Sequence, residues 1–271
     1  MILTNRDKIL FEKLFCYAVM TTRQIGKTVF ENIQLTTVLR RLRKLEKHGF
    51  VRRYAGINTY ECAWILTEKS ALMLSDRPPK WRQSRALIEH DTTLTSLRMA
   101  LEGVGIARSW IPEHEIRMKV AAKYGPESAK NRLIPDGIMG VQWQDFKESV
   151  AIELELHSKN ATRYRDNFYD YKRKSNLLGV WYLTPRETLG RHIEKLWRQS
   201  VPAELRPIFY WSVVDEVLEN PLGARVTFNG QSQLLSEICV PKNSELLAQP
   251  PAQVVGKEST RKECARESVS V

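Results

Sequence analysis

The stretch from Val150 to Lys159 constrains the fold of this chain most, because apolar and polar residues alternate along it as VAIELELHSK. Successive side chains of a β-strand point to opposite faces of the sheet, so the alternation predicts a strand. One face of that strand would carry Glu153, Glu155, His157 and Lys159. Burial of unpaired charges is costly. A buried strand with this many polar side chains on one face therefore indicates a functional site.

A second motif, Leu133 to Gly137 (LIPDG), predicts the neighbouring strand. If the two strands are neighbours, Asp136 lies beside Glu153 and Glu155. Carboxylate oxygens of this kind are the ligands that Mg²⁺ and Mn²⁺ prefer. We therefore predict that Asp136, Glu153 and Glu155 bind Mg²⁺ or Mn²⁺ as the cofactor, and that Lys159 or Glu155 orients the nucleophile. A metal ion beside a residue that orients the nucleophile indicates phosphodiester chemistry. In that chemistry the metal ion neutralises phosphate oxygens and lowers the pKa of a bound water.

The charge of the chain indicates a polyanionic partner. Lysine and arginine number 42 against 31 acidic residues, which gives a net charge of +11 over 271 residues. Nucleic acid is the usual partner of such a surface, and the alternative is a solvated basic surface without a partner. The four cysteines show no C-x-x-C spacing and the five histidines no H-x-x-x-H pairing, so we expect no zinc site.

The N-terminus lacks the apolar core of a signal peptide, and no apolar run reaches membrane-spanning length. We therefore expect a soluble, cytoplasmic protein without membrane insertion.

Residues 1–76 are predicted to form a winged helix-turn-helix domain. Apolar spacing predicts helices over 7–17, from Thr21, and from Gln34 to Gly49, followed by strands over 51–54 and 60–66 and a helix over 67–74. The third helix would enter the major groove, with phosphate contacts from its basic residues and from the wing. The residues predicted to bind DNA here are Thr36, Thr37, Arg40, Arg41, Arg43, Lys44, Arg52 and Arg53. The alternatives are a protein-binding domain and a merely solvated helix face.

The rest of the chain is predicted to hold a larger domain. Residues 77–103 form a linker and a connecting helix, in which His90 and Asp91 are either catalytic or, as we favour, hydrogen-bonded to neighbours. Strands over 107–110, 133–141, 150–157, 179–183 and 208–214, with helices over 160–176 and 186–199, predict an α/β sheet domain at 104–216. A C-terminal extension at 217–240 and a disordered tail at 241–271 follow. The fold class is α+β.

The helix after Lys159 carries aromatic and basic side chains together. Phe168 and Tyr171 are expected to pack on the sheet. Arg163 is a candidate for binding a phosphate through both of its terminal nitrogens. Tyr164 is a candidate nucleophile that would hold a cleaved strand covalently, although packing is the alternative. Glu113 and Glu115 are further candidate contributors to the metal site, although we favour a solvated strand end for both.

The spacing of Asp136 from Glu153-Leu154-Glu155 resembles the PD-(D/E)xK nuclease superfamily, with Glu155 where the family has its lysine. Some restriction endonucleases of that superfamily carry the same variant. The resemblance implies a restriction-endonuclease-like fold and a divalent metal. It leaves the role of the family's lysine open, and Lys159 is the candidate for that role.

A broader resemblance covers residues 5 to 215 and joins the winged-helix pattern with Glu89-His90-Asp91, LIPDG, AIELELHSK, Arg163-Tyr164 and Tyr171. These segments resemble the replication-relaxation family, which includes mobilisation proteins of the MobC type. The resemblance implies a plasmid or integrative-element protein that recognises a transfer origin in double-stranded DNA and nicks it as a relaxase without a histidine cluster. Other relaxosome or coupling proteins are possible partners.

Two rival functions remain open. A catalytically inactive accessory or regulatory DNA-binding protein of the relaxosome would explain the missing lysine at Glu155, and it would have no need to bind a metal. A transcription factor with an α/β effector domain would instead have an apolar ligand pocket. That second rival gives no reason for three acidic residues to converge.

Overall fold

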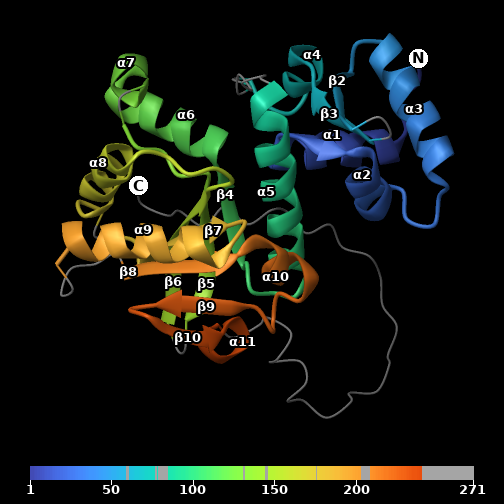
Figure 1. The fold of residues 1–271 in the computed structure, drawn as a ribbon. Coiled ribbons are helices and arrows are strands. Elements are labelled where there is room, and N and C mark those ends of the chain that lie inside the picture. The colour runs from blue at the N-terminus through green and yellow to red at the C-terminus, as the bar shows by residue number, and fades with distance from the viewer. Residues whose placement is uncertain are drawn as a thin grey trace, which may run out of the picture.

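The computed structural model describes residues 1–58, 61–76, 78, 85–130, 132–143, 146–174, 176–202 and 208–239. The predicted disordered tail at 241–271 and most of the linker at 77–84 lie outside the described residues. Figure 1 shows an N-terminal unit, a long helix and a larger unit built on one sheet. The predicted α+β architecture is confirmed.

The N-terminal unit packs helices against a small antiparallel sheet of order β1-β3-β2. Its helices are α1 (Asn5–Tyr17), α2 (Thr22–Val29), α3 (Leu35–Lys47) and α4 (Glu68–Ala71), and its strands are β1 (Met20–Thr21), β2 (Val51–Asn58) and β3 (Glu61–Leu66). Phe11, Leu42 and Trp64 are among the fully buried side chains that form its core. The apolar spacing in the sequence located the helices because each presents one apolar face to this core, whereas the two-residue strand β1 was not predicted.

Side-chain caps explain where two of these helices begin. Thr4 and Asp7 form a reciprocal capping box at the start of α1, and Thr21 and Gln24 form another at the start of α2. Each box satisfies backbone N–H groups that the first helical turn leaves without partners. Thr21, from which the sequence predicts the second helix, is thus the N-cap of α2.

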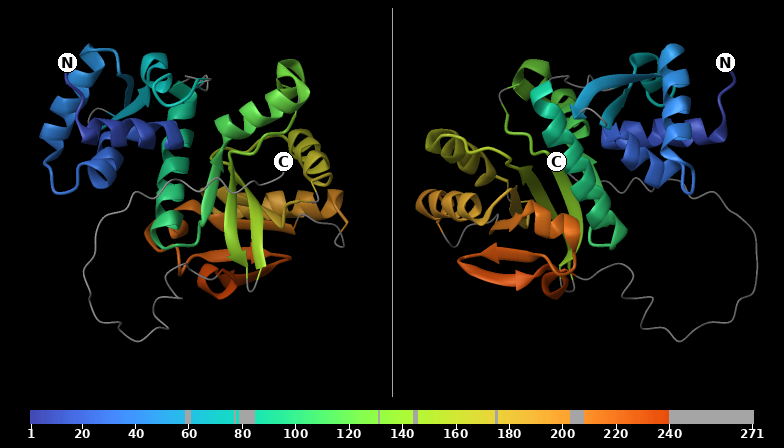
Figure 2. Two further views of the ribbon diagram at one scale, coloured as in Figure 1. Left: turned by 180° about the vertical axis from the view of Figure 1, so that it is seen from behind. Right: turned by 45° about the vertical axis from the view of Figure 1, so that its right-hand side comes forward.

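Helix α5 (Arg85–Gly103) joins the two units and contacts both. Gln24 of α2 donates through Nε2 to Ser96 Oγ at 2.8 Å, and Thr95 Oγ1 donates to the Val19 carbonyl at 2.9 Å. On another side, Leu97 and Leu101 are buried in the core of the larger sheet. Figures 1 and 2 accordingly show α5 between the N-terminal unit and the sheet.

The larger unit is built on a seven-stranded mixed sheet of order β10-β9-β8-β7-β6-β5-β4. The strands are β4 (Ser109–Pro112), β5 (Gly137–Trp143), β6 (Phe146–Leu154), β7 (Gly179–Thr184), β8 (Ile208–Val213), β9 (Arg225–Phe228) and β10 (Gln231–Leu234). Strands β6, β7 and β8 are parallel, and the remaining neighbours are antiparallel. The site residues lie at the carboxyl end of β6.

Helices cover both faces of this sheet (Figure 2). One face packs against α6 (Glu113–Tyr124), α7 (Pro126–Lys130), α8 (Ala161–Tyr171) and α9 (Glu187–Ser200), and the other against α5, α10 (Val214–Glu219) and α11 (Leu235–Ile238). Because strand side chains alternate, Ile152 belongs to the core under α5 and Ala151 to the core under α8. Glu153 therefore faces the α8 side, and Leu154 faces the α5 side.

The structure differs from the sequence expectations at several places. Strand β5 begins at Gly137, so Leu133 to Asp136, which were predicted to lie in this strand, precede it. Strand β6 ends at Leu154, so Glu155, His157 and Lys159 follow in an irregular segment instead of extending the strand. Helix α6 begins at Glu113, where a strand end was expected. Residues 225–234 add β9 and β10 to the sheet, so the segment predicted as an extension is part of the larger unit. Both strands span only four residues, so the alternation in β9 (RVTF) is too short to identify a strand, and β10 (QSQL) is exposed throughout.

Within the part of the chain that the structure describes, no helix is both long enough and apolar enough to cross a membrane.

Candidate active site

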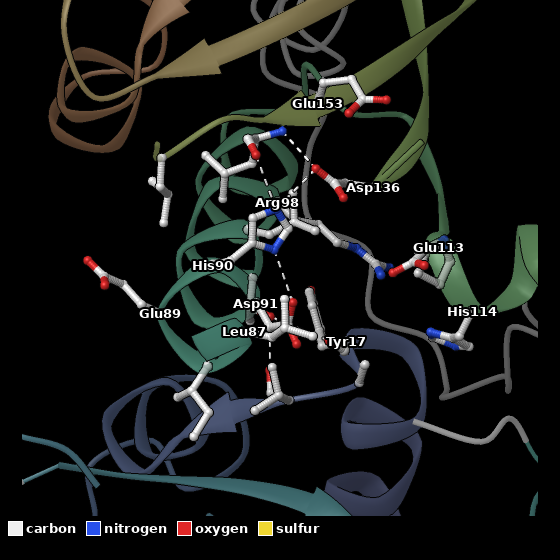
Figure 3. A pocket seen from close by; sticks show the side chains of 18 of the residues that line it. Tyr17, Leu87, Glu89, His90, Asp91, Arg98, Glu113, His114, Asp136 and Glu153 are labelled. Carbon is white, nitrogen blue, oxygen red and sulfur yellow. Dashed lines mark hydrogen bonds and ion pairs between the residues drawn. The ribbon is translucent and has the colours of Figure 1, made fainter. Parts of the chain in front are cut away.

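A cavity of about 670 Å³ lies between the N-terminal unit, α5 and the carboxyl end of β6. Its polar wall includes His90, Asp136, Glu153, Glu155 and Lys159. Figure 3 shows His90, Asp136 and Glu153 close together at one end of it, with Tyr17 and His114 further away. Four residues that the sequence assigned to catalysis, Asp136, Glu153, Glu155 and Lys159, therefore line a single cavity.

Asp136 immediately precedes β5 and ties that strand to β6. Its Oδ2 accepts a hydrogen bond from the backbone N–H of Leu154 at 2.8 Å. Its backbone carbonyl accepts from the N–H of Glu113 at 3.2 Å, which joins the site to the start of α6. The carboxylate is thus held at the point where β5 begins and β6 ends.

Glu153 is a buried acid of the site, with 7% of its surface exposed. The buried hydroxyl of Tyr171, on α8, donates a hydrogen bond to its carboxylate. Burial, followed by the charge of Asp136, raises the pKa of Glu153. Two neighbouring carboxylates repel each other when both are ionised, and a bound cation would offset that repulsion.

Glu155 and Lys159 form an ion pair beside these acids. The backbone N–H of Glu155 donates to the Leu183 carbonyl at 2.9 Å, which holds the residue against the end of β7. Lys159 Nζ lies 2.6 Å from Glu155 Oε2. Burial alone would lower the pKa of Lys159, but the hydrogen bond and charge of Glu155 outweigh it and raise that pKa. Lys159 therefore stays a cation, which suits it to stabilise negative charge and not to act as a base.

His90, on α5, belongs to the same cluster. Its Nε2 lies 3.2 Å from Asp136 Oδ2, and its Nδ1 lies 3.0 Å from Asp91 Oδ1. Burial would lower the pKa of His90, but the hydrogen bonds to Asp136 and Asp91 outweigh it and raise the pKa to about 10. The favoured hydrogen-bonding role of His90 and Asp91 agrees with this geometry. No pattern in the sequence connects His90 with Asp136; the only signal is a histidine that follows Glu89 and precedes Asp91 in a predicted helix.

The raised pKa of His90 predicts a pH dependence of stability in the metal-free protein. In the unfolded chain the imidazole titrates near 6.5, and in the folded protein near 10. The stabilisation is therefore fully present below about pH 6.5 and is lost as the pH rises toward 10. We expect the difference in unfolding free energy between wild type and His90→Gln to shrink over that interval, as measured by urea denaturation. A difference that stays constant from pH 6 to pH 10 would contradict the raised pKa.

The structure brings the predicted metal ligands to one cavity but does not arrange them as a finished metal site. Among the described residues no three His, Cys, Asp or Glu side chains are grouped to hold a metal ion. Tyr171 and Lys159 contact the carboxylates of Glu153 and Glu155. The hard oxygen donors and the mutual repulsion of the acids still fit Mg²⁺ or Mn²⁺. Metal binding here requires Glu153 to give up its proton.

Tyr164 does not lie where a nucleophile would need to be. Its side chain is fully buried, and its hydroxyl oxygen accepts the backbone N–H of Lys159 at 3.1 Å. Burial raises its pKa, which makes the phenolate less accessible. Phe168 and Tyr171 are also fully buried, so their predicted packing on the sheet is confirmed.

Arg163 and His157 are exposed and line the cavity, whereas Glu113 and Glu115 form ion pairs within their own helix. Asn160 caps the start of α8 by accepting the backbone N–H of Arg163 at 2.8 Å. Glu113 pairs with Arg117, and Glu115 pairs with Lys119. Glu113 also lines the cavity, with its carboxylate paired to Arg117, so its contribution to a metal site stays a prediction.

The residues predicted to bind DNA lie on the N-terminal unit, away from the sheet (Figure 1). The exposed ones are Thr36, Thr37, Arg40, Arg43 and Lys44 on α3, and Arg52 and Arg53 on β2. Arg41 differs, because its Nε donates to Asp7 Oδ1 at 2.8 Å and a second nitrogen contacts the other oxygen. Its side chain is engaged with Asp7 of α1 and is less exposed than those of Arg40 and Arg43.

Comparisons with known proteins add little. No protein-family profile matches the chain, and no curated protein matches it. A solved structure to which it is similar is restriction endonuclease FokI, at 12% sequence identity and a TM-score of 0.25. The match covers 81% of this chain and 45% of that one, so the chain spans less than half the length of the endonuclease. A similarity at this level carries no argument about function.

Proposed function

We propose that this protein is a DNA-binding nuclease that nicks one strand in a reaction that depends on Mg²⁺ or Mn²⁺. The observation that carries the proposal is the convergence of Asp136, Glu153, Glu155 and Lys159 on one cavity at the end of β6. Three acids beside a lysine are difficult to explain as packing, because burial raises the pKa of Glu153 and Glu155 and so opposes their charged forms.

Each residue of the site has a distinct role in this proposal. Asp136, Glu153 and Glu155 would hold the metal, which when bound supplies charge neutralisation and a more acidic water. Lys159, kept protonated by Glu155, stabilises negative charge near the scissile phosphate. Arg163, which lines the cavity, binds a neighbouring phosphate and orients the strand.

The N-terminal unit would supply docking on DNA as a winged helix-turn-helix domain, and the sheet unit would supply cleavage. Three helices followed by the β2–β3 hairpin fit that domain type, with α3 as the recognition helix. The exposed row of Thr36, Thr37, Arg40 and Arg43 would contact the major groove, and Arg52 and Arg53 the phosphates. Recognition of a transfer origin during mobilisation, with other relaxosome proteins as partners, follows from the family resemblance and is part of the proposal.

The second candidate function is a catalytically inactive DNA-binding accessory protein. It is favoured by the contacts that occupy the acids, because Tyr171 binds Glu153 and Lys159 binds Glu155. Such contacts offset part of the cost of burying the carboxylates without a metal.

Nicking of supercoiled plasmid that carries a cognate transfer region separates the two candidates. Wild-type protein with Mg²⁺ or Mn²⁺ is expected to convert supercoiled DNA to open circles, whereas Glu153→Ala and Asp136→Asn should lose at least about 100-fold in rate. His192→Ala, an exposed substitution on α9, serves as the control. Tight, salt-sensitive DNA binding by wild type without nicking in either metal would support the accessory function instead.

The salt dependence of binding tests α3 as the docking helix. Arg40 and Arg43 are exposed on α3, and if each neutralises one phosphate, Arg40→Ala/Arg43→Ala should reduce the slope of log K against log [salt] by about 2. The matched control is Arg191→Ala/Lys195→Ala, which removes the same charge from exposed positions on α9. Fluorescence anisotropy at several salt concentrations measures both slopes. Equal slopes for the two double variants would exclude α3 as the contact surface.

A further inference from the structure

His90 bridges two groups at the end of β6. Its Nε2 lies 3.2 Å from Asp136 Oδ2 and 3.1 Å from the backbone carbonyl oxygen of Leu154 (Figure 3). Asp136 is 46 residues and Leu154 is 64 residues further along the chain. A single atom, His90 Nε2, therefore links α5 both to the start of β5 and to the end of β6.

Asp91 fixes the orientation of the ring. His90 Nδ1 lies 3.0 Å from Asp91 Oδ1, on the side of the ring opposite the contact with Asp136. Both ring nitrogens thus face oxygen acceptors, and both act as donors. A ring held from two sides cannot turn without breaking a charge-assisted hydrogen bond.

These contacts engage only one of the two carboxylate oxygens of Asp136. Oδ2 accepts hydrogen bonds from Leu154 N at 2.8 Å and from His90 Nε2 at 3.2 Å. Among the residues that the structure describes, none donates a hydrogen bond to Oδ1 of Asp136. The carboxylate is therefore locked in rotation, with its second oxygen available in the cavity that it lines.

We propose that His90, braced by Asp91, is a positioning residue that fixes Asp136 for metal binding. This inference rests on the proposed metal-dependent function and adds a residue to it from a different part of the chain. Groups that hydrogen-bond a ligating carboxylate orient it, and their loss commonly weakens metal binding by 10- to 100-fold. His90 also holds the Leu154 carbonyl, so its loss would loosen the β6 end that carries Glu153 and Glu155.

Mn²⁺ binding measured by electron paramagnetic resonance tests this role without reference to cleavage. We expect His90→Ala to bind Mn²⁺ about 10- to 100-fold more weakly than wild type. His90→Gln, whose amide N–H can still donate to Asp136, should recover part of that loss, and His192→Ala should bind as wild type does. Recovery by glutamine distinguishes orientation of Asp136 from a general effect on packing.

Asp91→Asn provides a second variant in case His90→Ala does not fold, and it should bind Mn²⁺ more weakly because the ring loses its charged brace. If wild type binds Mn²⁺ and the folded His90 and Asp91 variants bind it equally or more tightly, the positioning role is wrong. Tighter binding would mean that the ring competes with the metal. If wild type binds no Mn²⁺, the metal-dependent function itself fails, and the positioning role fails with it.

Discussion

Replacing Phe168 with alanine is expected to lower the free energy of unfolding by about 3–5 kcal/mol. The ring is fully buried on α8 and lies at the centre of an aromatic cluster. Its centroid is 4.9 Å from that of Trp197 and 6.2 Å from that of Tyr164, with Tyr182 and Phe209 also in contact. Alanine leaves a cavity that large, mutually packed rings cannot close, because each already contacts several others.

This substitution also tests how the site is supported. Helix α8 carries Tyr171, which holds Glu153, so loosening α8 should weaken Mn²⁺ binding as well as stability. The matched control is Tyr169→Ala on the same helix, since that ring is 57% exposed and should change stability by no more than about 0.5 kcal/mol. Chemical denaturation measures both variants. A loss below about 1 kcal/mol for Phe168→Ala would show that the cluster repacks.

Replacing Arg41 with alanine is expected to cost about 2–3 kcal/mol of stability. Asp7 is completely buried, and Arg41 donates to both of its carboxylate oxygens. Removing the guanidinium leaves a buried carboxylate whose remaining donors are the N–H and hydroxyl of Thr4. Because these two hydrogen bonds remain, the loss of stability should be smaller than for a buried carboxylate with no donors at all.

The same substitution separates a structural from a DNA-contacting arginine. Arg40→Ala, at the adjacent exposed position, should leave stability within about 0.5 kcal/mol and weaken DNA binding. Arg41→Ala should do the opposite: it destabilises the fold, and DNA binding measured well below its melting temperature stays close to wild type. If Arg41→Ala keeps wild-type stability and loses DNA affinity, the ion pair with Asp7 is not the main role of Arg41.

Local patterns in the sequence determined most of the elements around the site. Apolar spacing located the helices of the N-terminal unit, and Thr21 marked the start of α2, because a helix end must satisfy its own backbone groups with nearby residues. Alternation in the sequence from Val150 onward identified Glu153 and Glu155 as acids in a buried setting. These features depend on residues only a few positions apart, so they can be predicted from the sequence without knowledge of the tertiary structure.

Only the tertiary structure decided which side chains meet. His90 reaches Asp136 and Leu154 across 46 and 64 residues, and Arg41 reaches Asp7 across 34. Tyr171 binds Glu153 because α8 packs over the face of the sheet to which Glu153 points. A strand or helix pattern determines which face a side chain occupies. It does not determine the neighbour on that face, because that follows from how separate elements pack into one core.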